Sequence, residues 1–225
     1  MEFIAYTAAI DAAISLVSLL ILYTRRQKSS APSQKLDYFI KYIFWTFVFL
    51  TVLSCTILYV TGQAQMIMFI VADIILWISL TYMILLASEH TSKKQIGSLL
   101  TLFFVFAIAR NLFQLNGLLG APLEITGTLN YFFSNLDAWL MYAVWVPSAL
   151  VFFGIALRSS DAATKMRAIM FAIGLLLITF TWAFRFEAMR GIITSANYMI
   201  VAIGSIAGFA LLLGGIQYGS KKRSD

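Results

Sequence analysis

The sequence predicts an all-α integral membrane protein, a single domain over 1–225 that forms a bundle of seven transmembrane helices. Three observations predict this fold class. Apolar residues make up 61% of the chain and charged residues 12%, against roughly 45–50% and 25% in soluble domains. Seven stretches each hold the ~20 apolar residues that a helix needs to cross a bilayer. None of them alternates as barrel strands do, and helices satisfy their own backbone groups in lipid.

The predicted spans fill the chain and leave no soluble domain. They cover 3–23, 38–61, 65–88, 96–116, 136–157, 166–189 and 195–218. The first connection, around Pro32, is predicted to be a polar linker. The longest connection, 116–135, combines glycines with aromatic residues. This composition favours a segment at the membrane interface, with a lid over the bundle as the alternative.

Basic residues are concentrated in alternate connections, which predicts the orientation. Of the 16 Lys and Arg residues, only Arg110, Arg185 and Arg190 fall on the same side of the membrane as the N-terminus of the first span. The other 13 fall on the opposite side. The positive-inside rule therefore predicts an N-terminus outside and a C-terminus in the cytoplasm, in a plasma or cytoplasmic membrane. The first span lacks a basic flank before it, so we expect it to stay in the mature protein. The bilayer is the expected partner, and nucleic acid is not.

Residue types exclude several kinds of chemistry. Cys55 and His90 are the only cysteine and histidine, which excludes internal disulfides, clustered thiolate or histidine metal sites and bis-histidine haem. Cys55 is expected to be a small buried hydrophobe. The chain has no GxSxG, HExxH or phosphate-binding glycine loop. We therefore predict that the protein is not an enzyme and needs no cofactor.

Ionisable and aromatic residues in the outer halves of the spans form the candidate site. Asp11 and Asp73 each lie about eight residues, or ~12 Å, from the outer ends of their spans. Asp73 and Trp77 are four residues apart and share a helix face. Such residues are expensive inside a membrane and are functional candidates. The predicted ligand-binding residues are Asp11, Asp73, Trp77, Arg110, Tyr142, Trp182 and Arg185.

Each ionisable candidate has a structural alternative. Arg110 and Arg185 either extend to the outer headgroups or turn into the bundle. Asp11 and Asp73 are too deep and too short to reach water; they either fix helix packing through hydrogen bonds or ion pairs, or serve binding, proton relay or ion passage. The small residues of 204–208 allow close helix packing, within the bundle or in a homo-oligomer.

Seven helices, an outer N-terminus and short loops resemble the microbial rhodopsins. The local strings that carry this resemblance are 77–81, 151–154, Trp182 and 207–209. The family attaches retinal to a lysine in the seventh helix, where this chain has Ile206. Its third-helix counter-ion and seventh-helix acid correspond to Leu76 and Ala202, and Arg185 stands where the family has an aromatic residue. The resemblance implies a relative without the retinal lysine, so photochemistry is not expected.

Three functional hypotheses follow. The first is a receptor-like or sensory protein whose outer-half cavity binds a small amphipathic or zwitterionic ligand, because the candidate residues carry both charges. The second is a proton-coupled carrier or ion pathway that uses Asp11 and Asp73. It ranks lower because the cytoplasmic halves hold only scattered Ser and Thr, and because seven spans show no inverted repeat. The third is a non-catalytic subunit of a larger membrane complex.

Overall fold

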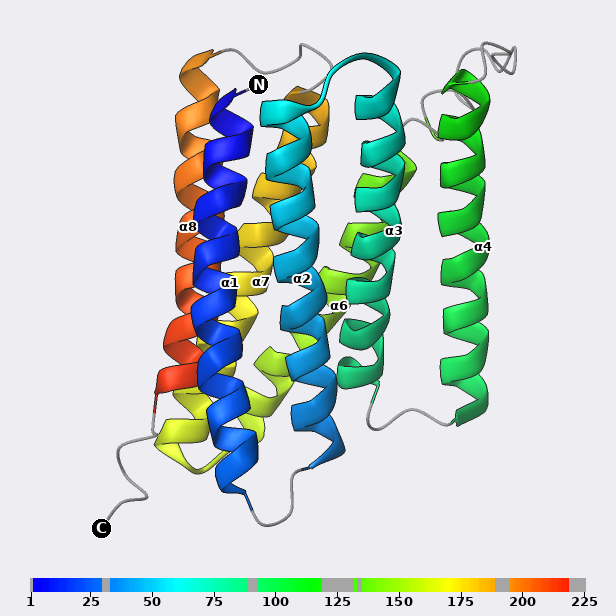
Figure 1. The fold of residues 1–225 in the computed structure, drawn as a ribbon. Coiled ribbons are helices and arrows are strands. Elements are labelled where there is room, and N and C mark those ends of the chain that lie inside the picture. Colours follow the sequence, from blue (N-terminus) through cyan, green and yellow to red (C-terminus); the bar gives the residue numbers. More distant parts are fainter. Residues whose placement is uncertain are drawn as a thin grey trace.

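The computed structural model describes residues 2–29, 33–88, 93–118, 132, 135–188 and 195–218, without the side chains of 2, 93, 117–118, 183–188 and 195–197. The elements in this part are α1 (Glu2–Lys28), α2 (Gln34–Tyr59), α3 (Gly62–Ala87), α4 (Lys93–Leu118), α6 (Leu136–Arg158), α7 (Ala162–Ala188) and α8 (Ser195–Gln217) (Figure 1). All seven contain a stretch long and apolar enough to span a membrane. The prediction of a seven-helix, multi-pass membrane protein is confirmed. The orientation and the membrane in which it lies stay predictions.

The helices extend beyond several predicted spans. α1 continues to Lys28 instead of ending at 23, and α7 begins at Ala162 instead of 166. Hydropathy marks only the part of a helix that lies in hydrocarbon, whereas backbone hydrogen bonding continues into the polar interface. Most of the predicted interfacial segment 116–135 lies outside the described residues.

The helices form a ring in chain order. Each packs on the next, α8 returns to α1, and α3 also contacts α6. Figure 1 shows α4 at one side of the bundle, and its main contacts are with α3 and α6. Among the described side chains of α4, only Phe103, Ala107 and Arg110 are buried. α4 is therefore the most weakly packed of the seven helices.

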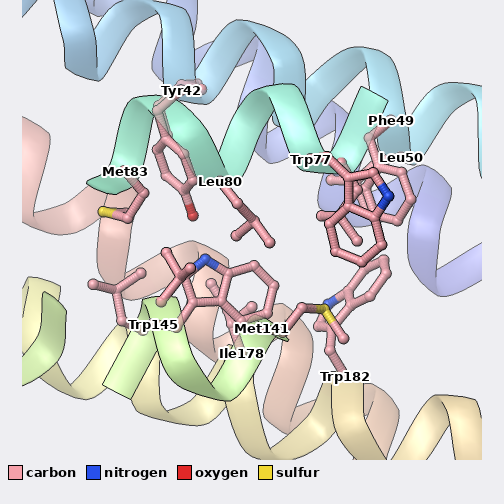
Figure 2. Packing of buried hydrophobic residues seen from close by; sticks show 14 of the residues in the cluster. Tyr42, Phe49, Leu50, Trp77, Leu80, Met83, Met141, Trp145, Ile178 and Trp182 are labelled. Carbon is pink, nitrogen blue, oxygen red and sulfur yellow. The ribbon is translucent and has the colours of Figure 1, made fainter. Parts of the chain in front are cut away.

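The centre of the bundle is aromatic. Trp77 of α3, Trp145 of α6 and Trp182 of α7 are all buried. The Phe49 ring of α2 packs on Trp182 with a centroid distance of 5.3 Å. Figure 2 shows these side chains around Leu80 and Met141, with the Tyr42 hydroxyl pointing toward the Trp145 indole nitrogen. Lipid is as apolar as these side chains, so the benefit of this packing comes mainly from van der Waals contact.

Glycines bring α7 and α8 into backbone contact. A Cβ added to Gly208 would lie 2.9 Å from the Gly174 carbonyl oxygen, and one added to Gly174 would lie 2.9 Å from the Gly208 carbonyl oxygen. Both distances are shorter than a Cβ tolerates. The small-residue stretch 204–208 therefore packs within the bundle, because only glycine permits this approach.

Arginines close the basic end of the bundle. Arg25 of α1 donates to the Ile216 carbonyl, and Arg167 Nε of α7 donates to the Tyr218 carbonyl at 2.6 Å. The Ile216 carbonyl belongs to the last turn of α8, and Tyr218 directly follows this helix. Carbonyls at a helix C-terminus have no internal donors left. Cation placement at a helix C-terminus is also favoured by the helix dipole.

Cys55 is exposed on the outer surface of α2, and the expectation of burial is wrong. Lipid is a suitable environment for a small, weakly polar thiol, so an apolar helix gives no reason to turn it inward. Hydropathy alone does not distinguish a face toward lipid from a face toward the core.

Candidate functional site

Two groups of buried polar residues lie on different parts of the ring. The first, the Asp11 cluster, joins α1, α7 and α8 through Asp11, Trp182 and Ser205. The Ser205 hydroxyl donates to Asp11 Oδ2 at 2.6 Å and accepts from Trp182 Nε1 at 3.2 Å. All three residues are buried. The indole therefore orients the hydroxyl, and the hydroxyl stabilises the carboxylate.

The second group, the Asp73 cluster, joins α3, α4 and α6 through Asp73, Arg110, Gln114 and Asp137. Gln114 Nε2 donates to Asp73 Oδ2 at 2.9 Å. Arg110 Nη2 lies 3.5 Å from Asp137 Oδ2. Asp73 is also within electrostatic reach of both Arg110 and Asp137. The exposed fractions are 6% for Asp73, 8% for Arg110 and 0% for Asp137, so these charged side chains are buried inside the bundle.

Local sequence explains how the Asp73 cluster forms. Arg110 and Gln114 are four residues apart on α4 and share a face with the buried Ala107. Asp137 lies in the first turn of α6, where the helix dipole favours a carboxylate. The single inward face of α4 thus carries a guanidinium and an amide against acids of α3 and α6.

Hydrogen bonding in the Asp73 cluster is incomplete. Within the described part of the chain, neither carboxylate oxygen of Asp137 accepts a hydrogen bond, and Arg110 Nε donates none. The nearby Trp77 Nε1, Asn111 Oδ1 and Gln114 Oε1 are also buried without partners there. Buried polar atoms are usually paired, and each unmade bond costs about 1–3 kcal/mol. These groups would therefore favour a polar ligand or an ion.

The ionised cluster also has unequal charges. Two carboxylates, Asp73 and Asp137, face one guanidinium, Arg110. A buried excess charge is costly unless it is protonated or paired. The cluster therefore favours a proton, a cation or the cationic group of a ligand.

Arg110 turns into the bundle and does not extend to the outer headgroups. Its ion-pair partner is Asp137, which the predicted site did not contain, and Asp73 is hydrogen-bonded by Gln114 instead. The positions of the remaining candidates differ. Trp77 is buried and packs edge-on against Phe103 at 6.0 Å between ring centroids.

Tyr142 and Arg185 are less closely tied to the two clusters. The Tyr142 ring contacts Trp139 and Phe180, both about half exposed. These contacts place Tyr142 at the edge of the bundle. Arg185 belongs to α7, but its side chain lies outside the described part of the structure.

One polar stripe, on α1, was not predicted from the sequence. Thr7, Asp11, Ser15 and Ser18 of α1 are all buried. Their spacings of four, four and three residues place them on one helix face. This pattern was readable from the sequence, and it shows that Asp11 belongs to the most polar inward face of α1.

The described residues contain no group of three or more His, Cys, Asp or Glu side chains suited to a metal ion.

An apolar cavity of about 290 Å³ lies between α4 and α6, beside the Asp73 cluster. Its walls include Phe103, Phe106, Leu136 and Leu140.

Comparisons of the chain with protein-family models, curated proteins and solved structures gave no match. The likeness to microbial rhodopsins therefore stays a prediction, and function has to be inferred from the two clusters.

Proposed function

We propose that the protein is a receptor-like or sensory membrane protein that binds a small zwitterionic ligand at the Asp73 cluster. The incomplete hydrogen bonding of this buried, charged group is the observation that carries the proposal. A ligand ammonium group would pair with Asp137 or Asp73, and a ligand carboxylate would accept from Arg110 Nε. Such a ligand supplies both a donor for the carboxylates and an acceptor for Arg110 Nε. A simple ion would supply only one of the two, so we prefer a zwitterion as the ligand.

The position of the cluster links binding to a change in α4. Asp73 and Asp137 belong to neighbouring helices, whereas Arg110 and Gln114 belong to the weakly packed α4. A ligand bridging these residues would stabilise the state in which α4 lies close to α3 and α6. A ligand shifts an equilibrium only by its different affinity for the two states, and helix shifts of about 1–2 Å are a common response.

A panel of amino acids and betaines tests this function with the purified full chain. We expect at least one zwitterion to raise the melting temperature of the wild type, with the increase lost in Asp137→Asn and Asp73→Asn. No increase with any zwitterion, or the same increase in both variants, would reject the proposed site.

Spin labels test the predicted response of α4. In a Cys55→Ala background, labels at Leu112→Cys on α4 and Tyr59→Cys on α2 occupy exposed positions. We expect the distance between these labels to shorten when the stabilising zwitterion binds. The pair Tyr59→Cys and Met199→Cys, on α2 and α8, is the control and should not change. An unchanged α4 distance would reject the response mechanism.

A proton-coupled carrier or ion pathway is the second candidate, and contacts in the basic half of the bundle favour it. Thr46 Oγ1 of α2 lies 2.7 Å from Ser79 Oγ of α3, and Ser79 also donates to the Tyr42 carbonyl at 3.2 Å. The Ser and Thr residues that look scattered in the sequence thus join two helices. In proteoliposomes with an internal pH dye, a carrier should lose proton entry in Asp73→Asn and Asp11→Asn. Wild-type rates in both would exclude this pathway.

A further inference from the structure

A cavity of about 710 Å³ lies at the basic end of the bundle, away from both polar clusters. It is formed by the start of α2, the end of α3, the end of α6 and the start of α7. Its walls include Lys35, Leu86, Leu150, Ile155, Arg158 and Thr164. Its volume falls in the range of about 300–1,000 Å³ that is usual for small-molecule sites.

The cavity changes from basic to apolar along α6. Arg158 is the last residue of α6 and Lys35 lies in the first turn of α2, so both basic groups are at the membrane boundary. Leu150 lies about eight residues deeper than Arg158, which corresponds to ~12 Å of helix. With an exposed fraction of 62%, Leu150 also opens this apolar part toward lipid. The cavity therefore has the polarity of an amphiphile.

Neighbouring charged groups at this end already have protein partners. Arg26 pairs with Asp37 at 2.6 Å, and Arg25 and Arg167 bind carbonyls at the end of α8. The acid next to the cavity, Asp161, accepts hydrogen bonds from the Thr164 amide and hydroxyl. Arg158, by contrast, makes no ion pair or side-chain hydrogen bond within the described residues. Its guanidinium is available to an anion at the cavity rim.

We propose that this cavity binds an anionic phospholipid, with its phosphate at Arg158 and an acyl chain along Leu86, Leu150 and Ile155. Charge-assisted hydrogen bonds to a guanidinium hold phosphate strongly, and basic pockets between helices are known to bind anionic headgroups. The largely apolar wall gives a free phosphate little to contact. The proposal is independent of the ligand proposed for the Asp73 cluster.

Gly154 provides a way to fill the cavity without disturbing the fold. It lines the cavity, and a Cβ added there would meet no atom within 4 Å. Gly97 of α4 is a matched control, because a Cβ there also meets nothing within 4 Å and Gly97 is not part of this cavity. The purified full chain would be examined by native mass spectrometry with phosphatidylglycerol and, separately, with phosphatidylcholine. We expect the wild type and Gly97→Leu to retain phosphatidylglycerol at least fivefold better than phosphatidylcholine.

Gly154→Leu and Arg158→Gln should each reduce phosphatidylglycerol retention at least fivefold. Equal retention of the two lipids by the wild type would overturn the proposal. Reduced phosphatidylglycerol retention in Arg158→Gln with unchanged retention in Gly154→Leu would also overturn it, because the lipid would then bind an open basic surface. Loss in Gly154→Leu alone would indicate an apolar chain site without headgroup recognition, which also contradicts it. Displacement of the lipid by millimolar inorganic phosphate would show a free-anion site instead.

Discussion

The contact between α7 and α8 and the contacts of α4 with α3 and α6 represent two ways to join helices in lipid. α7 and α8 meet at Gly174 and Gly208, where one backbone touches the other. α4 meets its neighbours through buried charges, with an apolar cavity beside them. The first contact has little freedom to change without steric overlap. The second depends on partners whose hydrogen bonding is incomplete, so we expect a ligand or a proton to affect this contact more than the first.

The largest effect should come from breaking the ion pair that holds α4. Arg110→Met leaves Asp137 and Asp73 buried without their cation, and we expect a loss of about 3–5 kcal/mol in the free energy of unfolding. Asp137→Leu should also be destabilising, but the double variant should recover a large part of the loss. Unfolding in mixed detergent micelles would measure this cycle. Small, additive losses would show that Arg110 does not depend on Asp137.

The hydroxyl between α7 and α8 should have the next largest effect. Ser205→Ala removes the donor to Asp11 Oδ2 and the acceptor of the Trp182 indole, so we expect a loss of about 1.5–3 kcal/mol. Ser148→Ala is the control, because Ser148 is also buried but, among the described residues, bonds only to the Val144 carbonyl of its own helix. If both substitutions cost the same in the unfolding assay, the Asp11 cluster contributes no more than an ordinary buried hydroxyl.

Glycine substitutions compare the close α7–α8 contact with open helix surface. Gly174→Ala and Gly208→Ala force backbones apart, and overpacking of this kind costs about 1–3 kcal/mol. Gly154→Ala and Gly97→Ala should be neutral or stabilising by up to about 1 kcal/mol, because alanine favours helix and neither site is crowded. The same unfolding assay applies to all four variants. Equal effects at the crowded and open sites would contradict the close contact.

The smallest effect should come from Asp161, which lies in water before α7. Hydrogen bonds from the Thr164 side chain, the Thr164 amide and the Ala163 amide lower the pKa of this carboxyl from its usual value of 3.8. Its contribution is therefore present above that value and is lost as the pH falls through the lowered pKa. Asp161→Ala should melt slightly below the wild type at pH 7, and the difference should shrink below about pH 4. A difference that grows in acid would contradict this role.

Sequence patterns predicted the membrane class, the seven spans and the inward faces of Asp11, Asp73 and Trp182. These properties depend on length, hydropathy and helical periodicity, which belong to each segment separately. The same patterns placed Arg110 and Asp73 at similar depth, but they did not predict that Arg110 pairs with Asp137. Cys55 was assigned to the core for a related reason, because an apolar helix without a strong polar stripe gives no inward direction.

The sequence by itself determined which segments lie in the membrane and how deep each charged residue lies, because a charge in hydrocarbon restricts where a helix can be placed. Only the tertiary structure decided which charges meet. Residues at one depth on several helices have many combinations of partners, and the choice between Asp73 and Asp137 for Arg110 follows from how α4 is placed and rotated against α3 and α6. Contacts between different helices set that placement, and no single span encodes it.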